Sequence, residues 1–140
     1  MGAHNIEKSQ AKNSKFQILA NPQAPKLKRY DLEERTLEFG KRVIRLCQSL
    51  PKNTVNFKLI DQLIRSGTSI GANYREANET ETRKDFRYRI RICRKEAKES
   101  TYWLKLVIEA NPTLSSRIEP LVQEGCEFVK IFAAIALKIK

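Results

Sequence analysis

The side chains best suited to chemistry form a row of cations at helical spacing. Positions four, four, three and four residues apart fall on one side of an α-helix, so the row would extend for about 22 Å. It would lie about 100° round the helix from an apolar face that packs on a core. Guanidinium and ammonium groups in this arrangement can bind successive phosphates of a nucleic acid. The predicted phosphate-binding residues are Arg83, Arg87, Arg91, Arg94 and Lys98, together with Lys84 and Lys95.

This row also has a simpler interpretation. The same cations could form a solvated helix face, or could pair with acidic residues of a neighbouring subunit. The distribution of charge favours binding. The chain of 140 residues has a net charge of +11, and residues 1–30 carry 6 Lys/Arg against 1 acid, while residues 83–98 carry 8 against 2. Since the rest of the chain is balanced, the concentrated excess indicates an acidic partner, most often nucleic acid.

Residues that usually carry catalysis are scarce. The one histidine, His4, lies near the N-terminus, which argues against a histidine base or a metal site built on histidines. Cys47, Cys93 and Cys126 lie far apart within apolar helical patterns, and they predict free thiols in a reducing cytoplasm. We therefore expect no catalytic residues, no metal and no cofactor, and we predict that the chain is not an enzyme.

A run of small residues from Ser66 to Ala72 allows two interpretations. A phosphate-cradling loop is the weaker one, because there is no preceding strand and no Gly-x-x-x-x-Gly-Lys pattern. The helical period continues through Ile70 and Tyr74. This favours a helix in which Gly67 and Gly71 allow a neighbouring helix to approach closely.

Polar residues flank this run at helical spacing. Asp61 and Arg65 are four residues apart, as are Arg75 and Glu79. Pairs at this spacing can form ion pairs along one helix. We expect such pairs, or polar contacts between helices, in preference to a ligand site.

Apolar residues recur at helical spacing in four segments that are joined by short connections. Proline ends the first and third segments, at Pro51 and Pro112. Each segment begins near a residue that can cap a helix N-terminus. These residues are Asp31, as an N-cap or a first-turn residue, Asn53 or Thr54, Thr80, and Thr113 or Ser115.

The four segments predict an all-α fold, an antiparallel up-down-up-down four-helix bundle of residues 31–140 that follows a flexible basic tail, residues 1–30. Between residues 128 and 139 the last segment is apolar almost all round, with Lys130 and Lys138 as its charges. It is too short to span a bilayer, and no membrane partner is expected. A helix so apolar predicts a homo-oligomer that covers it.

The segment DQLIRSGTSIGANYREA, residues 61–77, is similar to the signature of a bacterial family of four-helix bundles first known from intervening sequences in 23S ribosomal RNA genes. The segments Lys84-Asp85-Phe86, Lys95-Glu96-Ala97 and Tyr102-Trp103-Leu104 carry the resemblance further. It covers about residues 30–140, and it implies a ring-like homo-oligomer of five subunits. The family includes the accessory variability protein of diversity-generating retroelements, whose basic surface binds nucleic acid and a reverse transcriptase.

Together these features support the hypothesis of a cytoplasmic, non-enzymatic oligomer that binds DNA or RNA through residues 83–98. The resemblance adds a reverse transcriptase of a diversity-generating retroelement as a partner to test. The alternative hypothesis is a structural or protein-interaction scaffold whose basic surface binds an acidic protein.

Overall fold

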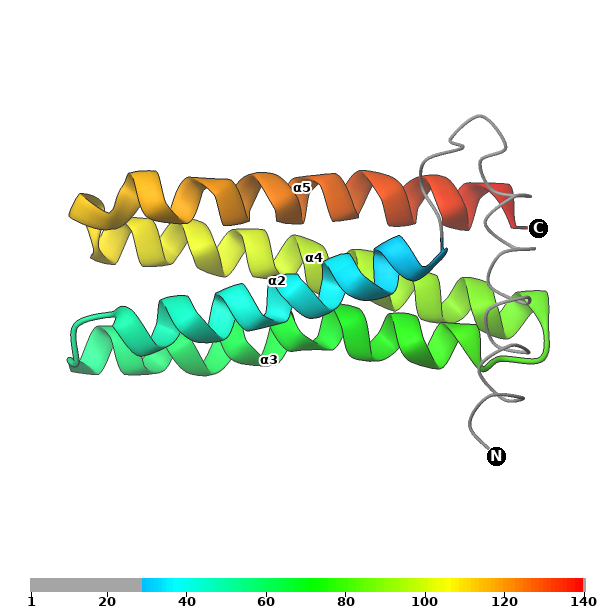
Figure 1. The fold of residues 1–140 in the computed structure, drawn as a ribbon, viewed down its shortest axis with the longest axis horizontal. Coiled ribbons are helices and arrows are strands. Elements are labelled where there is room, and N and C mark those ends of the chain that lie inside the picture. Colours follow the sequence, from blue (N-terminus) through cyan, green and yellow to red (C-terminus); the bar gives the residue numbers. More distant parts are fainter. Residues whose placement is uncertain (1–28, 140) are drawn as a thin grey trace.

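The computed structural model describes residues 29–139, with side chains from Leu32 onward, and these residues form an antiparallel bundle of long helices (Figure 1). No strand occurs within this range. The predicted all-α up-down-up-down bundle is therefore confirmed. Its elements are α2 (Arg29–Ser49), α3 (Thr54–Asn78), α4 (Arg83–Ala110), the 3₁₀ turn η1 (Pro112–Leu114) and α5 (Ser115–Lys138).

The start of α3 is as predicted, whereas the start of α4 is not. The Asn53 side chain accepts a hydrogen bond from the Asn56 amide at 2.8 Å, which caps α3. At α4 the cap is Thr82, whose hydroxyl oxygen accepts from the Asp85 amide at 3.0 Å. The predicted cap Thr80 is wrong, because its hydroxyl donates to the Ala77 carbonyl at 2.6 Å and so belongs to the end of α3.

The other two helix starts each agree with one of the predicted alternatives. α2 begins at Arg29, so Asp31 is a first-turn residue and not the N-cap. α5 begins at Ser115, one of the two predicted positions, after the single turn of η1. The predicted basic tail falls mostly on residues 1–28, which lie outside the described residues, and it stays a prediction.

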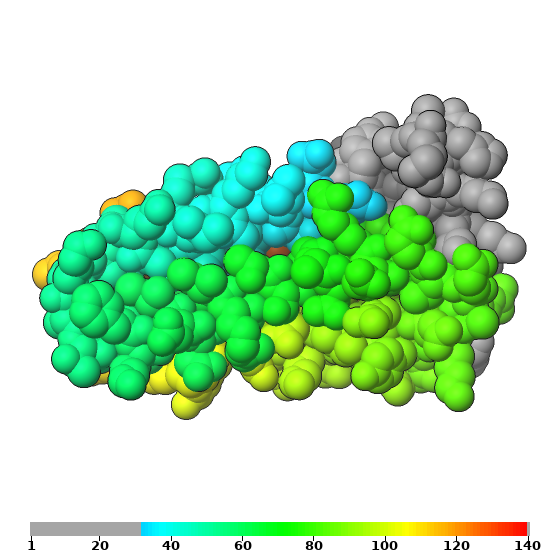
Figure 2. Space-filling model, turned by 90° about the horizontal axis from the view of Figure 1, so that it is seen from below, coloured from blue at the N-terminus to red at the C-terminus, as the bar shows by residue number. Residues whose placement is uncertain are grey.

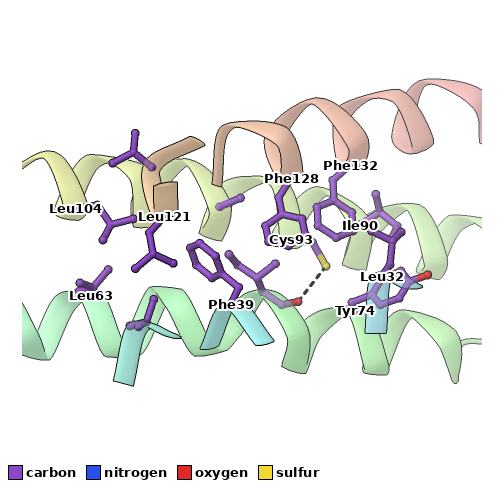
Figure 3. Packing of buried hydrophobic residues seen from close by; sticks show 14 of the residues in the cluster. Leu32, Phe39, Leu63, Tyr74, Ile90, Cys93, Leu104, Leu121, Phe128 and Phe132 are labelled. Atoms are coloured by element: carbon purple, nitrogen blue, oxygen red, sulfur yellow. Dashed lines mark hydrogen bonds between the residues drawn. The ribbon is translucent and has the colours of Figure 1, made fainter. Parts of the chain in front are cut away.

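Figure 2 shows α3 between α2 and α4. Figure 1 shows α5 running beside α4, away from α3. Aromatic rings from different helices pack against one another in the core (Figure 3). Phe39 of α2 meets Phe128 of α5 edge to face, with ring centroids 5.5 Å apart. Tyr74 of α3 lies 5.7 Å from Phe132 of α5. These contacts between rings far apart in sequence fix the helices around one core.

The run of small residues lies within α3, so the helical interpretation is confirmed. A Cβ atom added at Gly67 would come within 3.0 Å of Val43 Cγ2, and one added at Gly71 would come within 3.0 Å of Thr36 Oγ1. Both neighbours belong to α2. The glycines therefore permit α2 and α3 to pack more closely than alanine would.

The apolar end of α5 is covered mainly by the bundle of a single chain. Phe128, Phe132, Ile135 and Ile139 are all buried within it. Leu137 is the large apolar side chain of this stretch that stays exposed, at 74%. The apolar pattern from which assembly was predicted is thus accounted for largely within one subunit.

At one end of the bundle, the buried side-chain amides of Asn56 and Asn111 bond to each other and link the α2–α3 connection to the α4–α5 connection. Asn56 Nδ2 donates to Asn111 Oδ1 at 3.0 Å, and Asn111 Nδ2 donates back to Asn56 Oδ1 at 2.9 Å. Each amide also donates to a carbonyl, that of Pro51 or that of Val107. Such a satisfied polar pair fixes the start of α3 against the end of α4.

Replacing Asn56 with leucine is expected to lower the free energy of unfolding by about 1–3 kcal/mol, because the buried Asn111 amide loses its partner. Replacing both residues with leucine should cost less than the sum of the two single changes, since neither partner is then orphaned. Urea denaturation of the four proteins of this double-mutant cycle measures the effect. Strictly additive losses would contradict it.

Candidate nucleic-acid interface

The position of the cationic row follows from what α4 buries. Phe86, Ile90, Cys93 and Ala97 are completely buried on one side of the helix. The row lies about 100° round the helix from them, on the surface. Six of its seven members are exposed, namely Arg83, Lys84, Arg91, Arg94, Lys95 and Lys98.

The neighbours of α4 show which surface this is. On one side Arg89 Nη1 donates to Asn73 Oδ1 of α3 at 3.2 Å. On the other side a Cβ atom at Gly125 of α5 would come within 2.6 Å of Thr101 Cγ2. Thr101 lies next to the row in helical projection. The cations therefore run along the side of α4 that borders α5, away from α3.

Within the part of the chain that the structure describes, none of the seven cations forms an ion pair. Two acids of α4 that could neutralise them are engaged elsewhere. Glu96 accepts a hydrogen bond from Arg65 of α3 at 3.2 Å, and Glu99 binds the same guanidinium. The positive charge of the row is thus left uncompensated inside the described bundle.

Arg87 differs from the rest of the row. It is half-buried, and its Nε atom is buried without a hydrogen-bond partner among the described residues. A long arginine stem can pack on apolar surface while its outer nitrogens stay in water. Arg87 is therefore partly packed against the bundle, although its helical position lies away from the apolar face of α4.

The two arginines that flank the small-residue run of α3 pair with carboxylates of other helices. Arg65 binds Glu96 and Glu99 of α4, and the Glu99 hydrogen bond raises the pKa of its guanidinium. Arg75 Nη1 lies 3.7 Å from Glu33 Oε1 of α2. Of the two predicted arrangements, the polar contacts between helices are the one that forms, because neighbouring helices place carboxylates beside these arginines.

The thiols of the described residues are not arranged for catalysis. Burial raises the pKa of Cys47 to about 11 and also raises the pKa of Cys93. The Cys93 thiol donates to the Ile70 carbonyl oxygen at 3.6 Å (Figure 3). Among residues 29–139, no three His, Cys, Asp or Glu side chains come together as a metal site would require.

A thiol reagent such as Ellman's reagent is expected to modify Cys126 faster than the other two thiols in the native protein, because only Cys126 is partly exposed. Cys47 and Cys93 should react only on unfolding, since both are buried and protonated. The absorbance change should therefore correspond to about one fast thiol per chain. The Cys126→Ala variant should lose the fast phase, and its persistence would contradict the assignment.

The described residues define a small all-α four-helix bundle with an uncompensated cationic face along one helix. A family model described as 23S rRNA-intervening sequence protein matches residues 28–134. The chain belongs to this family.

A solved structure has the same fold. It is a crystal structure of a protein with unknown function from the S23 ribosomal protein family of Bacteroides thetaiotaomicron, 34% identical, with a TM-score of 0.72. The alignment covers 79% of this chain and 99% of that chain. A search of curated proteins finds no match. In residues 29–139 no helix combines the length and the apolar character needed to cross a membrane.

Proposed function

We propose that the protein is a non-enzymatic, cytoplasmic nucleic-acid-binding protein that contacts phosphates through the cationic row of α4. The observation that carries the proposal is that seven cations of one helix have no acidic partner within the described bundle. Six of these cations are exposed, so their unpaired groups keep their donors available for phosphate oxygens. A row about 22 Å long can reach several phosphates of a strand.

RNA and DNA are both suitable ligands for such a row, since its contacts are to the backbone and not to base edges. The family is named after intervening sequences of ribosomal RNA genes. A narrower role, as the accessory factor of a reverse transcriptase in a diversity-generating retroelement, rests on the family resemblance. It requires a reverse-transcriptase gene and a variable repeat beside the gene for this protein.

We expect binding to be independent of base sequence and to weaken steeply with salt. The logarithm of the binding constant should fall by about 0.9 per logarithmic unit of salt for each duplex phosphate that is neutralised. Fluorescence anisotropy with duplex DNA, single-stranded RNA and polyglutamate as a polyanion control measures this. Binding to polyglutamate with none to either nucleic acid would favour the alternative, a scaffold for an acidic protein.

We also propose that the protein is a homo-oligomer, with a five-subunit ring as the form that the resemblance implies. Leu37 and Ile44 line one hollow between α2 and α3, and further large apolar side chains of the described bundle are exposed, so that assembly would cover them. Together these side chains are Leu37 (41%), Ile44 (40%), Val55 (58%), Phe57 (53%), Tyr102 (58%) and Leu137 (74%).

Light scattering coupled to size exclusion is expected to give a mass several times the 16.2 kDa of one chain. Assembly would repeat the cationic row in every subunit and raise the avidity for a long strand. Substitution of Leu137 or Phe57 with glutamate tests which exposed side chains take part. A monomer mass at micromolar concentration would contradict the proposal.

A further inference from the structure

A cavity of about 190 Å³ lies between α2 and α5. Its lining consists of Leu46 and Leu121, which are buried, and of three arginines, Arg42, Arg45 and Arg117. The leucines close the cavity toward the core, so the arginines surround its open side. Arg42 and Arg45 come from the second half of α2 and Arg117 from the first turn of α5, at the end of the bundle where the α2–α3 and α4–α5 connections lie (Figure 1).

The charge around this cavity is only partly neutralised. Arg45 Nη2 lies 2.7 Å from Glu38 Oε2, in an exposed pair. Arg42 and Arg117 form no ion pair with any described residue. Three guanidinium groups and one carboxylate leave a local excess of two positive charges.

At the other end of the α2–α5 contact, the positive charge of α2 is neutralised by acidic residues of α5. There Arg35 binds Glu124 at 2.7 Å and Glu127 at 3.4 Å, and its guanidinium lies 5.2 Å from the centre of the Phe128 ring. The cation of α2 is thus met by acids of α5. At the cavity, α5 supplies a further arginine, and no acidic residue is part of the lining.

The start of α5 adds to this excess. Leu114, at the N-cap position, provides no side-chain hydrogen bond, and no acidic residue lies in the first turn. The N-terminal end of a helix carries partial positive charge, so a cation such as Arg117 is unfavourably placed there. A bound anion would relieve this repulsion and accept hydrogen bonds from the guanidinium groups.

We infer that the cavity binds a phosphate monoester. Such a group carries about −1.5 to −2 charges at neutral pH and has three terminal oxygens, which suits an excess of two positive charges. A phosphodiester of a nucleic-acid backbone carries one charge and is better served by the open row of α4. The cavity volume of about 190 Å³ exceeds the volume of a few water molecules, so the cavity has room for a phosphate group. This site is separate from α4 and does not depend on the proposed function.

The monoester could be free phosphate, a nucleoside monophosphate or the 5′-phosphate end of a strand, and the probes distinguish these sources. Calorimetry with inorganic phosphate and with adenosine monophosphate, at constant ionic strength, tests the small ligands. Anisotropy with one labelled oligonucleotide, carrying either a 5′-phosphate or a 5′-hydroxyl, tests the strand end. We expect saturable phosphate binding, and a preference of about tenfold for the 5′-phosphate if strand ends are the source.

The variant Arg42→Gln/Arg117→Gln should lose this binding, and Arg117→Gln alone, at an exposed position, should weaken it. The matched control Lys41→Gln/Lys58→Gln removes the same charge from exposed positions outside the cavity. It should bind phosphate like the unmodified protein, as should Arg91→Glu/Arg94→Glu in α4. Absence of phosphate binding together with no 5′-phosphate preference would overturn the inference. So would phosphate binding that survives in Arg42→Gln/Arg117→Gln.

Discussion

The variant Arg91→Glu/Arg94→Glu is expected to lose nucleic-acid binding, with an affinity at least about 100-fold lower than that of the unmodified protein. Both residues are exposed on α4 and have no ion pair among the described residues. The change removes two charge-assisted contacts and adds two charges that repel phosphate. Anisotropy with duplex DNA and with single-stranded RNA measures the loss.

Arg91 and Arg94 are chosen because their replacement leaves the packing intact. Arg87 would be a poorer choice, since its Nε atom is buried and its stem is part of the packed surface. The control Lys52→Glu/Lys58→Glu makes the same charge change at two exposed positions, one in the α2–α3 connection and one in α3, and should bind almost normally. Circular dichroism and light scattering should be unchanged in both variants. If Arg91→Glu/Arg94→Glu dissociates an oligomer, these arginines are ion-pair partners between subunits, and the proposed function fails.

The second large effect is expected at the α2–α3 contact. Gly67→Leu should lower the free energy of unfolding by roughly 1–3 kcal/mol, because even a Cβ atom there would come within 3.0 Å of Val43 Cγ2. At about 4 °C per kcal/mol, the melting temperature should fall by several degrees. Differential scanning calorimetry measures this fall.

Gly40 provides the matched control on the opposite helix. A Cβ atom at Gly40 would lie 3.9 Å from its nearest neighbours in α3, which is an ordinary contact. Gly40→Ala should therefore be neutral or should stabilise α2 by up to about 1 kcal/mol. A melting temperature that is unchanged by Gly67→Leu, or that falls with Gly40→Ala, would contradict the close packing described here.

The sequence determined the helices and most of their ends, because both depend on nearby residues. Apolar side chains at spacings of three and four select a buried stripe, as Phe86, Ile90 and Cys93 do on α4. Asn53 could be identified as a cap from its place before an apolar pattern. The cap of α4 could not be identified in this way, because Thr80 and Thr82 are both suitable and only the turn after α3 decides between them.

The tertiary structure decided which charged groups are paired and which are free. The spacing along a helix fixes the side of that helix on which a cation lies, but not which neighbouring side chains reach it. Arg65 and Arg75 thus pair across to α4 and α2, and Arg87 is half-buried although its spacing matches that of its exposed neighbours. Arg42 and Arg117 are far apart in sequence, and only the packing of α5 against α2 brings them to one cavity. Electrostatic interaction depends on distance through space, and for residues on different helices that distance is set by packing.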